Sequence, residues 1–147
     1  MKKIIPNIIT VEEAKIIIDN GKSITDNSFQ HPLISKIEDI IESELGEIEW
    51  SKPTYKRVEG KPGTFRGLRH DWHVDTGSKG HMQWCDYGGS ILLNDKDTSG
   101  FLEYRDGTKI LPKEHYCSLA IHSSDVEHRV YDKGSRQTLL LFLQRKL

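Results

Sequence analysis

Apolar residues in the first third of the chain recur at the spacing of amphipathic helices. After an apolar, strand-like stretch at 2–9, the sequence Thr10-Val11-Glu12-Glu13 has the form of a capping box, in which a threonine and a glutamate satisfy the backbone groups of a helix start. We expect a first helix from this box to the Asn20-Gly21 pair, which is typical of a helix end. A second helix is expected over 32–46, because acidic residues cover one side and apolar residues recur on the other: Leu33, Ile34, Ile37, Ile40, Ile41 and Leu45.

The pattern changes from helical to strand-like after Trp50. Five stretches then favour β-strands, and turn-forming pairs such as Asp106-Gly107 and Lys133-Gly134 separate them: 81–94, 100–105, 116–122, 126–132 and 136–145. Two helices followed by many short strands predict a mainly β, α+β fold, in which two sheets form a β-roll and the helices pack on one sheet. We expect one domain over 1–147, with a helical part at 1–49 and a β core at 50–147.

Composition narrows the class of protein without identifying it. Of 147 residues, 35% are apolar and 29% are charged, which is typical of a globular protein, and the net charge of −1 gives no reason to bind nucleic acid or an anionic membrane. The two cysteines, Cys85 and Cys117, do not have the spacing of a metal site or of a disulfide framework. No apolar run is long enough for a signal peptide or a membrane span. We therefore expect a cytoplasmic protein, with a monomer favoured over an oligomer.

A local excess of positive charge lies between positions 51 and 70. Six basic residues stand there against one acidic residue, Glu59: Lys52, Lys56, Arg57, Lys61, Arg66 and Arg69. The simpler interpretation is a solvated sheet edge. The alternative is a rim that attracts an anionic substrate. The sequence leaves both interpretations open.

The segment His73-Val74-Asp75 contains a possible pair of metal ligands. Side chains alternate between the two faces of a strand, so the histidine and the aspartate are expected on the same side. A second histidine from another strand would complete a 2-His-1-carboxylate set, which leaves three positions on an octahedral metal open. A His-x-Asp sequence also arises by chance at about this composition, so the pair alone is weak evidence.

His128 and Arg136 strengthen the case, because they lie in neighbouring strand-like stretches. A tight turn at Lys133-Gly134-Ser135 would pair the two strands and place both residues on one face, roughly 13 Å apart at ~3.3 Å per residue. That spacing leaves room for a five-carbon diacid between a metal and an arginine, whose planar fork suits a carboxylate. His122 is the rival third ligand. An isolated histidine is also common in a core, and Arg136 would be unremarkable at a solvated strand end.

The order of these residues resembles that in the iron(II)- and 2-oxoglutarate-dependent oxygenases, and it is most similar to their prolyl 4-hydroxylase-like branch. Over 55–143, the motifs of that branch are filled by Lys61-Pro62-Gly63, His73-Val74-Asp75, Leu93-Asn94, Gly100-Phe101-Leu102-Glu103-Tyr104, His128 and Gly134-Ser135-Arg136. The resemblance implies a double-stranded β-helix, that is, a jelly roll. It also implies that His73, Asp75 and His128 hold iron(II) at the open end.

The resemblance further implies the co-substrates. Arg136 would bind the distal carboxylate of 2-oxoglutarate, dioxygen would be the oxidant, and ascorbate could serve as an accessory reductant. The strand before Asn94 lacks the tyrosine that helps some relatives to hold 2-oxoglutarate. Tyr87, Tyr104 or Thr138 is therefore expected to supply that hydroxyl group.

By the same resemblance, the reaction is hydroxylation of a C–H bond, since Asp75 is present where halogenating relatives have a small residue. The expected substrate is a prolyl or other residue in a peptide or protein. The candidates for contacting it are Arg66, Arg69, Trp84 and Tyr104. Two alternatives stay open: a free amino acid or other small metabolite as the substrate, and a non-catalytic jelly-roll module that only binds a ligand. An inward-facing aspartate argues against such a module, because an unused buried carboxylate is costly.

Overall fold

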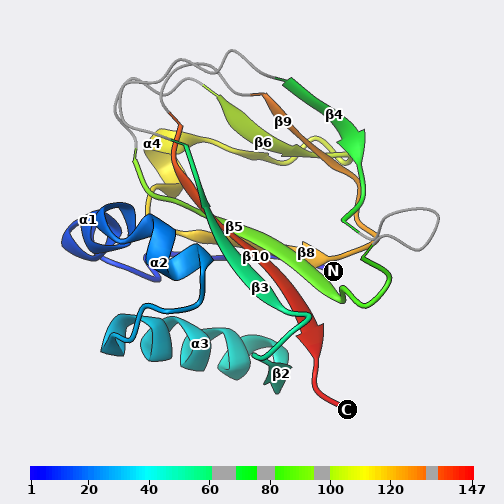
Figure 1. Cartoon of the computed structure of the whole chain (residues 1–147). Coiled ribbons are helices and arrows are strands. Elements are labelled where there is room, and N and C mark those ends of the chain that lie inside the picture. The colour runs from blue at the N-terminus through cyan, green and yellow to red at the C-terminus, as the bar shows by residue number, and fades with distance from the viewer. Residues whose placement is uncertain (61–68, 76–81, 95–99, 132–135) are drawn as a thin grey trace.

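The computed structural model describes residues 1–60, 69–75, 82–94, 100–131 and 136–147, without the side chains of 69–71. Two antiparallel sheets lie face to face (Figure 1). The larger sheet has the order β1-β8-β5-β10-β2, and β3 also pairs with β10. Its strands are β1 Lys2–Ile5, β2 Ile48–Glu49, β3 Tyr55–Glu59, β5 Tyr87–Leu92, β8 Leu119–Ser123 and β10 Thr138–Arg145. The smaller sheet has the order β4-β9-β6-β7, with β4 Arg69–His73, β6 Phe101–Tyr104, β7 Lys109–Ile110 and β9 His128–Tyr131.

Two of the N-terminal helices, α1 and α3, begin where the sequence predicts. In α1, Val11–Asp19, the Thr10 hydroxyl accepts from the Glu13 N–H at 3.1 Å and the Glu13 carboxylate accepts from the Thr10 N–H at 2.9 Å, so the capping box is confirmed. A short helix that was not predicted, α2, Gly21–Thr25, follows at once. The long helix α3, Pro32–Leu45, ends at Gly46, whose φ of +89° favours glycine. A fourth helix, α4, Pro112–His115, precedes β8.

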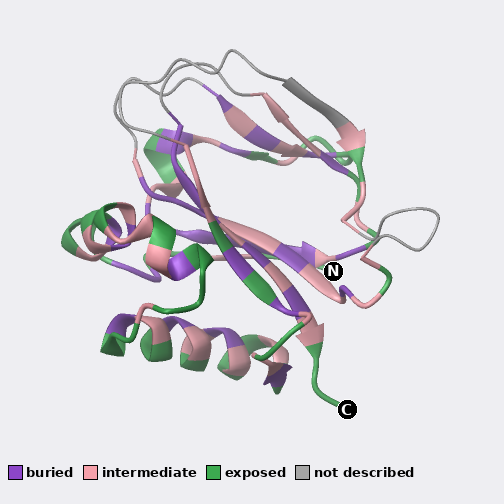
Figure 2. Cartoon of the chain, viewed as in Figure 1, coloured by how far each residue is buried: buried purple, intermediate pink, exposed green. Residues whose placement is uncertain are grey.

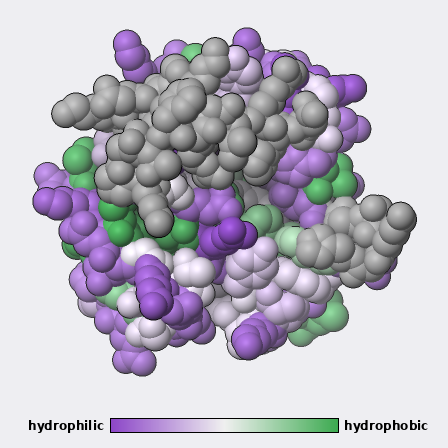
Figure 3. Space-filling view, turned by 45° about the horizontal axis from the view of Figure 1, so that its top comes forward, coloured by the Kyte–Doolittle hydropathy of each residue, from purple (hydrophilic) through white to green (hydrophobic). Residues whose placement is uncertain are grey.

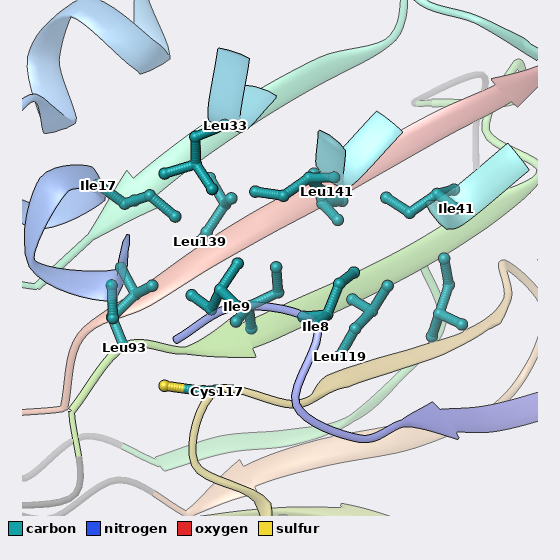
Figure 4. Close-up of a cluster of buried hydrophobic side chains, with 14 of the residues drawn as sticks. Ile8, Ile9, Ile17, Leu33, Ile41, Leu93, Cys117, Leu119, Leu139 and Leu141 are labelled. Atoms are coloured by element: carbon teal, nitrogen blue, oxygen red, sulfur yellow. The ribbon is translucent and has the colours of Figure 1, made fainter. Parts of the chain in front are cut away.

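The main apolar core lies between these helices and one face of the larger sheet. Ile17, Leu33 and Ile41 of the helices lie against Leu139 and Leu141 of β10, and all five side chains are buried (Figure 4). Figure 2 shows that the buried residues of α3 lie on the side of the helix that faces the sheet. Each buried aliphatic side chain contributes roughly 1.5–3 kcal/mol. The predicted arrangement, two sheets with helices packed on one of them, is therefore confirmed.

Alternation along the strands gives the larger sheet a second, inner face. In β10, Leu139 and Leu141 face the helices, so Thr138, Leu140 and Phe142 face the smaller sheet. Seen from the end where the smaller sheet lies, the described surface mixes hydrophilic side chains with separate apolar groups (Figure 3). The cavity that carries the candidate site lies between this inner face and the smaller sheet.

The expected hairpin between the last two strands is wrong. β9 lies in the smaller sheet between β4 and β6, whereas β10 lies in the larger sheet between β3 and β5. Each is an inner strand with both edges already paired, so neither has an edge for the other. The predicted turn at Lys133-Gly134-Ser135 lies outside the described residues. His128 and Arg136 consequently belong to opposite walls of the cavity.

Several strands are shorter than the sequence predicted. β1 stops at Ile5, because Pro6 follows and Asn7 has a φ of +49°. Of the predicted stretch 81–94, the described residues 82–94 form a strand only over Tyr87–Leu92, and Met82 has a φ of +53°. In the described part of the chain, no helix has the length and apolar character that a membrane span requires.

Candidate functional site

Three potential metal ligands meet where the smaller sheet ends. His73 is the last residue of β4, and the register of the sheet places it directly beside His128, the first residue of β9. Their rings lie 4.3 Å apart between centroids. Asp75 follows two residues after His73, and its Oδ1 is 3.3 Å from Nε2 of His128. One ligand atom from each of the three side chains lies within 4.8 Å of the others.

These separations fit one octahedral metal ion. Two ligand atoms about 2.1 Å from an ion and at right angles to each other are roughly 3.0 Å apart. The 3.3 Å between Asp75 and His128 is close to that value, and the third ligand atom is within range. Two imidazoles and one carboxylate on one side of an ion form the facial set that leaves three positions open. The donor set therefore fits iron(II).

Asp75 is held over the larger sheet by contacts that its sequence motif does not reveal. Its backbone N–H donates to the Ser124 carbonyl at 2.9 Å, and its Oδ2 accepts from Nε2 of His122 at 2.6 Å. The carboxylate lies on Gly88 of β5: a Cβ atom there would stand 1.7 Å from Oδ2 and 2.6 Å from Cγ of Asp75. Gly88 is thus a site residue that sequence reasoning missed, because its role depends on a contact with Asp75, which follows a strand of the other sheet.

The hydrogen bonds of His122 fit a residue that supports Asp75 better than they fit a metal ligand. Its Nδ1 is 2.9 Å from the hydroxyl of Tyr104, and its Nε2 donates to Asp75, so both ring nitrogens are occupied. Burial lowers the pKa of His122, which keeps the ring neutral. Burial and the charge of Asp75 raise the pKa of Tyr104, which keeps its hydroxyl protonated and able to donate to Nδ1. The chain Tyr104–His122–Asp75 links the two sheets beneath the ligands.

His128 differs from His122 in the way its two ring nitrogens are used. Its Nδ1 donates to the Val126 carbonyl at 2.9 Å, which fixes the tautomer and leaves the Nε2 lone pair facing the cluster. Burial opposes ionisation of Asp75, but the hydrogen bond from His122, together with the nearby ring of His128, outweighs it and lowers the pKa of the carboxyl. An ionised carboxylate beside an imidazole with a free lone pair is the state that binds a divalent cation.

Arg136 lies at the other end of the same cavity. It is buried, and it lines the cavity together with Thr138, Leu140 and the three potential ligands. The backbone N–H of Gln137, which follows Arg136, donates to Asn94 Oδ1 at 2.8 Å. Gly60, which follows β3 and has a φ of +91°, lies against the Arg136 carbonyl. A Cβ at Gly60 would be 2.2 Å from that oxygen. The Leu-Asn motif thus fixes the backbone that carries the arginine.

The other predicted site residues are placed less favourably. Tyr87 packs against the main core on the helix-facing side of β5. The alternate positions face the other way: Gly88 lies against Asp75, and Ser90 lines the cavity. The Tyr104 hydroxyl is engaged by His122 and the side chain is 2% exposed, so it does not contact a substrate or co-substrate. Of the three candidates for the extra hydroxyl, only Thr138 lines the cavity.

The expected substrate contacts and basic rim are also only partly supported. Trp84 is half-buried and packs edge-on against Tyr55, outside the cavity lining. Arg66 lies outside the described residues, and so does the side chain of Arg69. Lys56 is buried on the helix-facing side of β3, where its ammonium group is 3.2 Å from Glu38, so it cannot belong to an exposed rim.

We predict that His122→Phe keeps one metal ion per chain but weakens its affinity. The change removes the donor to Asp75 and leaves both ligating histidines, and lost outer partners of metal ligands cost about 10–100-fold in affinity. A manganese(II) titration followed by electron paramagnetic resonance measures both quantities. If His122→Phe binds no metal while His128→Phe binds it like the wild type, then His122 is the ligand and His128 is the supporting residue.

The comparisons with known proteins bear on the fold. No protein-family model and no curated protein sequence matches the chain. Among solved structures, a prolyl 4-hydroxylase from Pseudomonas putida aligns with a TM-score of 0.69 at 15% identity, covering 99% of this chain and 85% of that one. The collagen prolyl hydroxylase vCPH of Paramecium bursaria Chlorella virus-1, in its 2-oxoglutarate complex, gives 0.68 at 13% identity, covering 99% and 96%. EvdO2 from Micromonospora carbonacea var. aurantiaca, complexed with 2-oxoglutarate, gives 0.61 at 15% identity, covering 97% and 86%.

The chain therefore has the jelly-roll fold of the 2-oxoglutarate- and iron(II)-dependent oxygenases, with prolyl 4-hydroxylases among its structural neighbours. The resemblance seen in the sequence is confirmed at the level of the fold. Within this fold, the chain places a His-Asp-His cluster and a buried arginine in one cavity.

Proposed function

We propose that this chain is an iron(II)- and 2-oxoglutarate-dependent dioxygenase that hydroxylates a C–H bond of a second substrate. The observation that carries the proposal is the cavity itself, which is lined at one end by His73, Asp75 and His128 and at the other by the buried Arg136. A metal-binding face and a fixed cation in one cavity are complementary to a dicarboxylate that chelates the metal through one end.

Each group of residues has a separate task in this proposal. Bound iron(II) would activate dioxygen with 2-oxoglutarate as the reductant: carbon dioxide leaves, one oxygen atom enters the succinate that forms, and the other enters the substrate C–H bond as a hydroxyl group. Arg136 binds the distal carboxylate, and Thr138 is the residue best placed to add a hydrogen bond. Leu102, Val130 and Leu140 give the cavity apolar walls that exclude water.

Two substrate classes are compatible with this reaction. A prolyl or other residue in a peptide or protein is supported by the neighbours that are named prolyl hydroxylases. A free amino acid is supported by a feature of this chain, the ion pair between Arg57 and Glu59 at the cavity wall. A non-catalytic binding module would have no use for an ordered ligand set with a supporting hydrogen-bond chain.

We expect Arg136→Ala to weaken 2-oxoglutarate binding while metal binding survives. The variant removes a largely desolvated partner of a carboxylate, and such truncations cost on the order of 2–5 kcal/mol, or at least about tenfold in affinity. Calorimetric titration of 2-oxoglutarate into manganese(II)-loaded protein measures the effect. Arg105→Ala, which truncates an exposed arginine on the smaller sheet, is the matched control and should bind like the wild type. Equal affinities in wild type and Arg136→Ala would remove Arg136 from the co-substrate site.

A further inference from the structure

The cavity holds one ion pair that the proposed reaction does not use. Arg57 and Glu59 of β3 are separated by one residue, line the same cavity as the metal ligands, and approach within 3.2 Å through Arg57 Nε and Glu59 Oε1. The Arg57 side chain is 56% exposed and that of Glu59 is 22% exposed. The pair thus lies at the boundary between the cavity and solvent, where a substrate would enter.

Charge balance singles out this pair. Among the described residues, the cavity is lined by four ionised side chains: Asp75, Arg136, Arg57 and Glu59. In the proposed complex, the metal charge is balanced by Asp75 and one carboxylate of 2-oxoglutarate, and Arg136 is balanced by the other carboxylate. Of the charged lining residues that the structure describes, Arg57 and Glu59 then have no role in the reaction, and they are held next to each other. A ligand that carries one carboxylate and one ammonium group complements both charges, whereas an anionic ligand complements only Arg57.

The surface between this pair and the metal combines the apolar Leu140 and Phe142 with the polar Ser90. In the register of the larger sheet, Arg57 lies beside Leu140, and the next inward-facing row contains Phe142 beside Gly88, on which the metal ligand Asp75 lies. At ~4.8 Å between strands and ~3.4 Å per residue, the Cα atoms of Arg57 and Gly88 are about 12 Å apart. The long arginine side chain spans part of that distance, so an aliphatic side chain of a few carbons can span the rest.

A peptide suits this wall less well. Its interior residues carry neutral amides in place of the two charges, so Arg57 and Glu59 would lose water without gaining charged partners. Addition of a peptide strand to the outer edge of β3 is also opposed, because the Val58 N–H there already donates to the Thr25 hydroxyl at 3.1 Å and α2 packs against Val58 through Gly21.

From this arrangement we propose that the primary substrate is a free, zwitterionic α-amino acid with an aliphatic side chain. Arg57 binds its carboxylate, Glu59 binds its ammonium group, and Leu140 and Phe142 support the side chain whose C–H bond is hydroxylated. This inference rests on the proposed function and chooses between its two substrate classes. In the free enzyme the two residues pair with each other, and the substrate replaces that pairing.

The first experiment compares probes. Succinate formation and the gain of one oxygen atom are measured with the full set of free protein amino acids, with the N-acetyl amides of the same residues, and with a proline-rich peptide. We expect a free aliphatic amino acid to be hydroxylated and its N-acetyl amide, which has lost both charges, to be inactive. The proposal is overturned if the peptide or an N-acetyl amide is hydroxylated at least as well, or if no free amino acid binds.

The second experiment tests the two residues. Arg57→Gln and Glu59→Gln should each raise the KM for the amino acid by about tenfold or more, since hydrogen bonds to charged groups are worth that much. Calorimetric binding of the amino acid to manganese(II)- and 2-oxoglutarate-loaded protein should weaken equally. Lys3→Gln and Glu44→Gln alter an exposed ion pair between β1 and α3 that does not line the cavity, and they should change neither value. Unchanged KM in both cavity variants would overturn the proposal.

The design separates this inference from the proposed function. Metal binding and the slow succinate formation that occurs without an amino acid are measured first in the wild type, and Lys3→Gln and Glu44→Gln should leave both unchanged. If those activities are present while every amino acid fails, the substrate class is wrong and the oxygenase assignment stands. If the wild type forms no succinate under any condition, the oxygenase assignment itself is wrong.

Discussion

Gly88→Ala is expected to abolish metal binding at micromolar metal, although glycine has no side chain to offer a metal. The added Cβ would stand 1.7 Å from Oδ2 of Asp75 and 3.0 Å from Nε2 of His122, so the ligand carboxylate must move away from His128. We expect metal affinity to fall by about 100-fold or more, at the upper end of what lost outer partners cost. A manganese(II) titration of the purified variant measures the change.

Gly89→Ala, one residue along the same strand, is the matched control. Its Cβ would point to the other side of β5 and meet the Ala120 carbonyl at 2.9 Å, so it should destabilise the fold, by about 1–3 kcal/mol for an overpacked core. The folded fraction should still bind metal with wild-type affinity. If Gly88→Ala binds metal as well as Gly89→Ala does, Asp75 is not held where the structure places it.

Asp75→Ala should also remove the metal, for a more direct reason. The variant deletes the only carboxylate among the three potential ligands, and the remaining imidazoles of His73 and His128 supply no negative charge. We expect a loss larger than the ~100-fold that outer partners cost, and no succinate formation. Glu103→Ala is a suitable control, since that carboxylate pairs with Arg129 on the smaller sheet and does not line the cavity. Metal content is measured by elemental analysis after dialysis.

Wild-type metal content in dialysed Asp75→Ala would contradict the assignment of the ligands. In that case the metal would have to bind at a different group of side chains. Normal metal content together with lost succinate formation would also contradict it, because Asp75 would then act in the reaction without binding the ion.

Much of this architecture could be predicted because its signals are local. The capping box at Thr10 depends on four consecutive residues, and the apolar spacing of α3 depends on one helix. His73 and Asp75 are two residues apart, so the motif itself brings them together. The strand partners of β9 and β10 could not be predicted in this way, because either edge of an apolar, alternating strand can pair, and the choice depends on the other strands.

The supporting residues of the site were missed for the same reason. Gly88 is important because β5 passes beneath a carboxylate supplied by the opposite sheet, and no local pattern records that contact. Tyr104 was expected at the substrate, but its hydroxyl bonds to His122, 18 positions away and in the other sheet. Arg57 and Glu59 are two positions apart in β3, so strand alternation predicts that they share a face. Only the structure shows that this face lines the same cavity as the potential metal ligands.

Succinate formation in air is the measurement that tests the central claim most directly. The iron(II)-loaded wild-type chain is supplied with 2-oxoglutarate and the set of free amino acids, and succinate is quantified beside Asp75→Ala and an anaerobic sample. We predict succinate from the wild type in air, with carbon dioxide released in equal amount, and none above background from the variant or without dioxygen. Succinate at the level of Asp75→Ala, from wild-type protein that has bound both iron and 2-oxoglutarate, would contradict the assignment of this chain as an oxygenase.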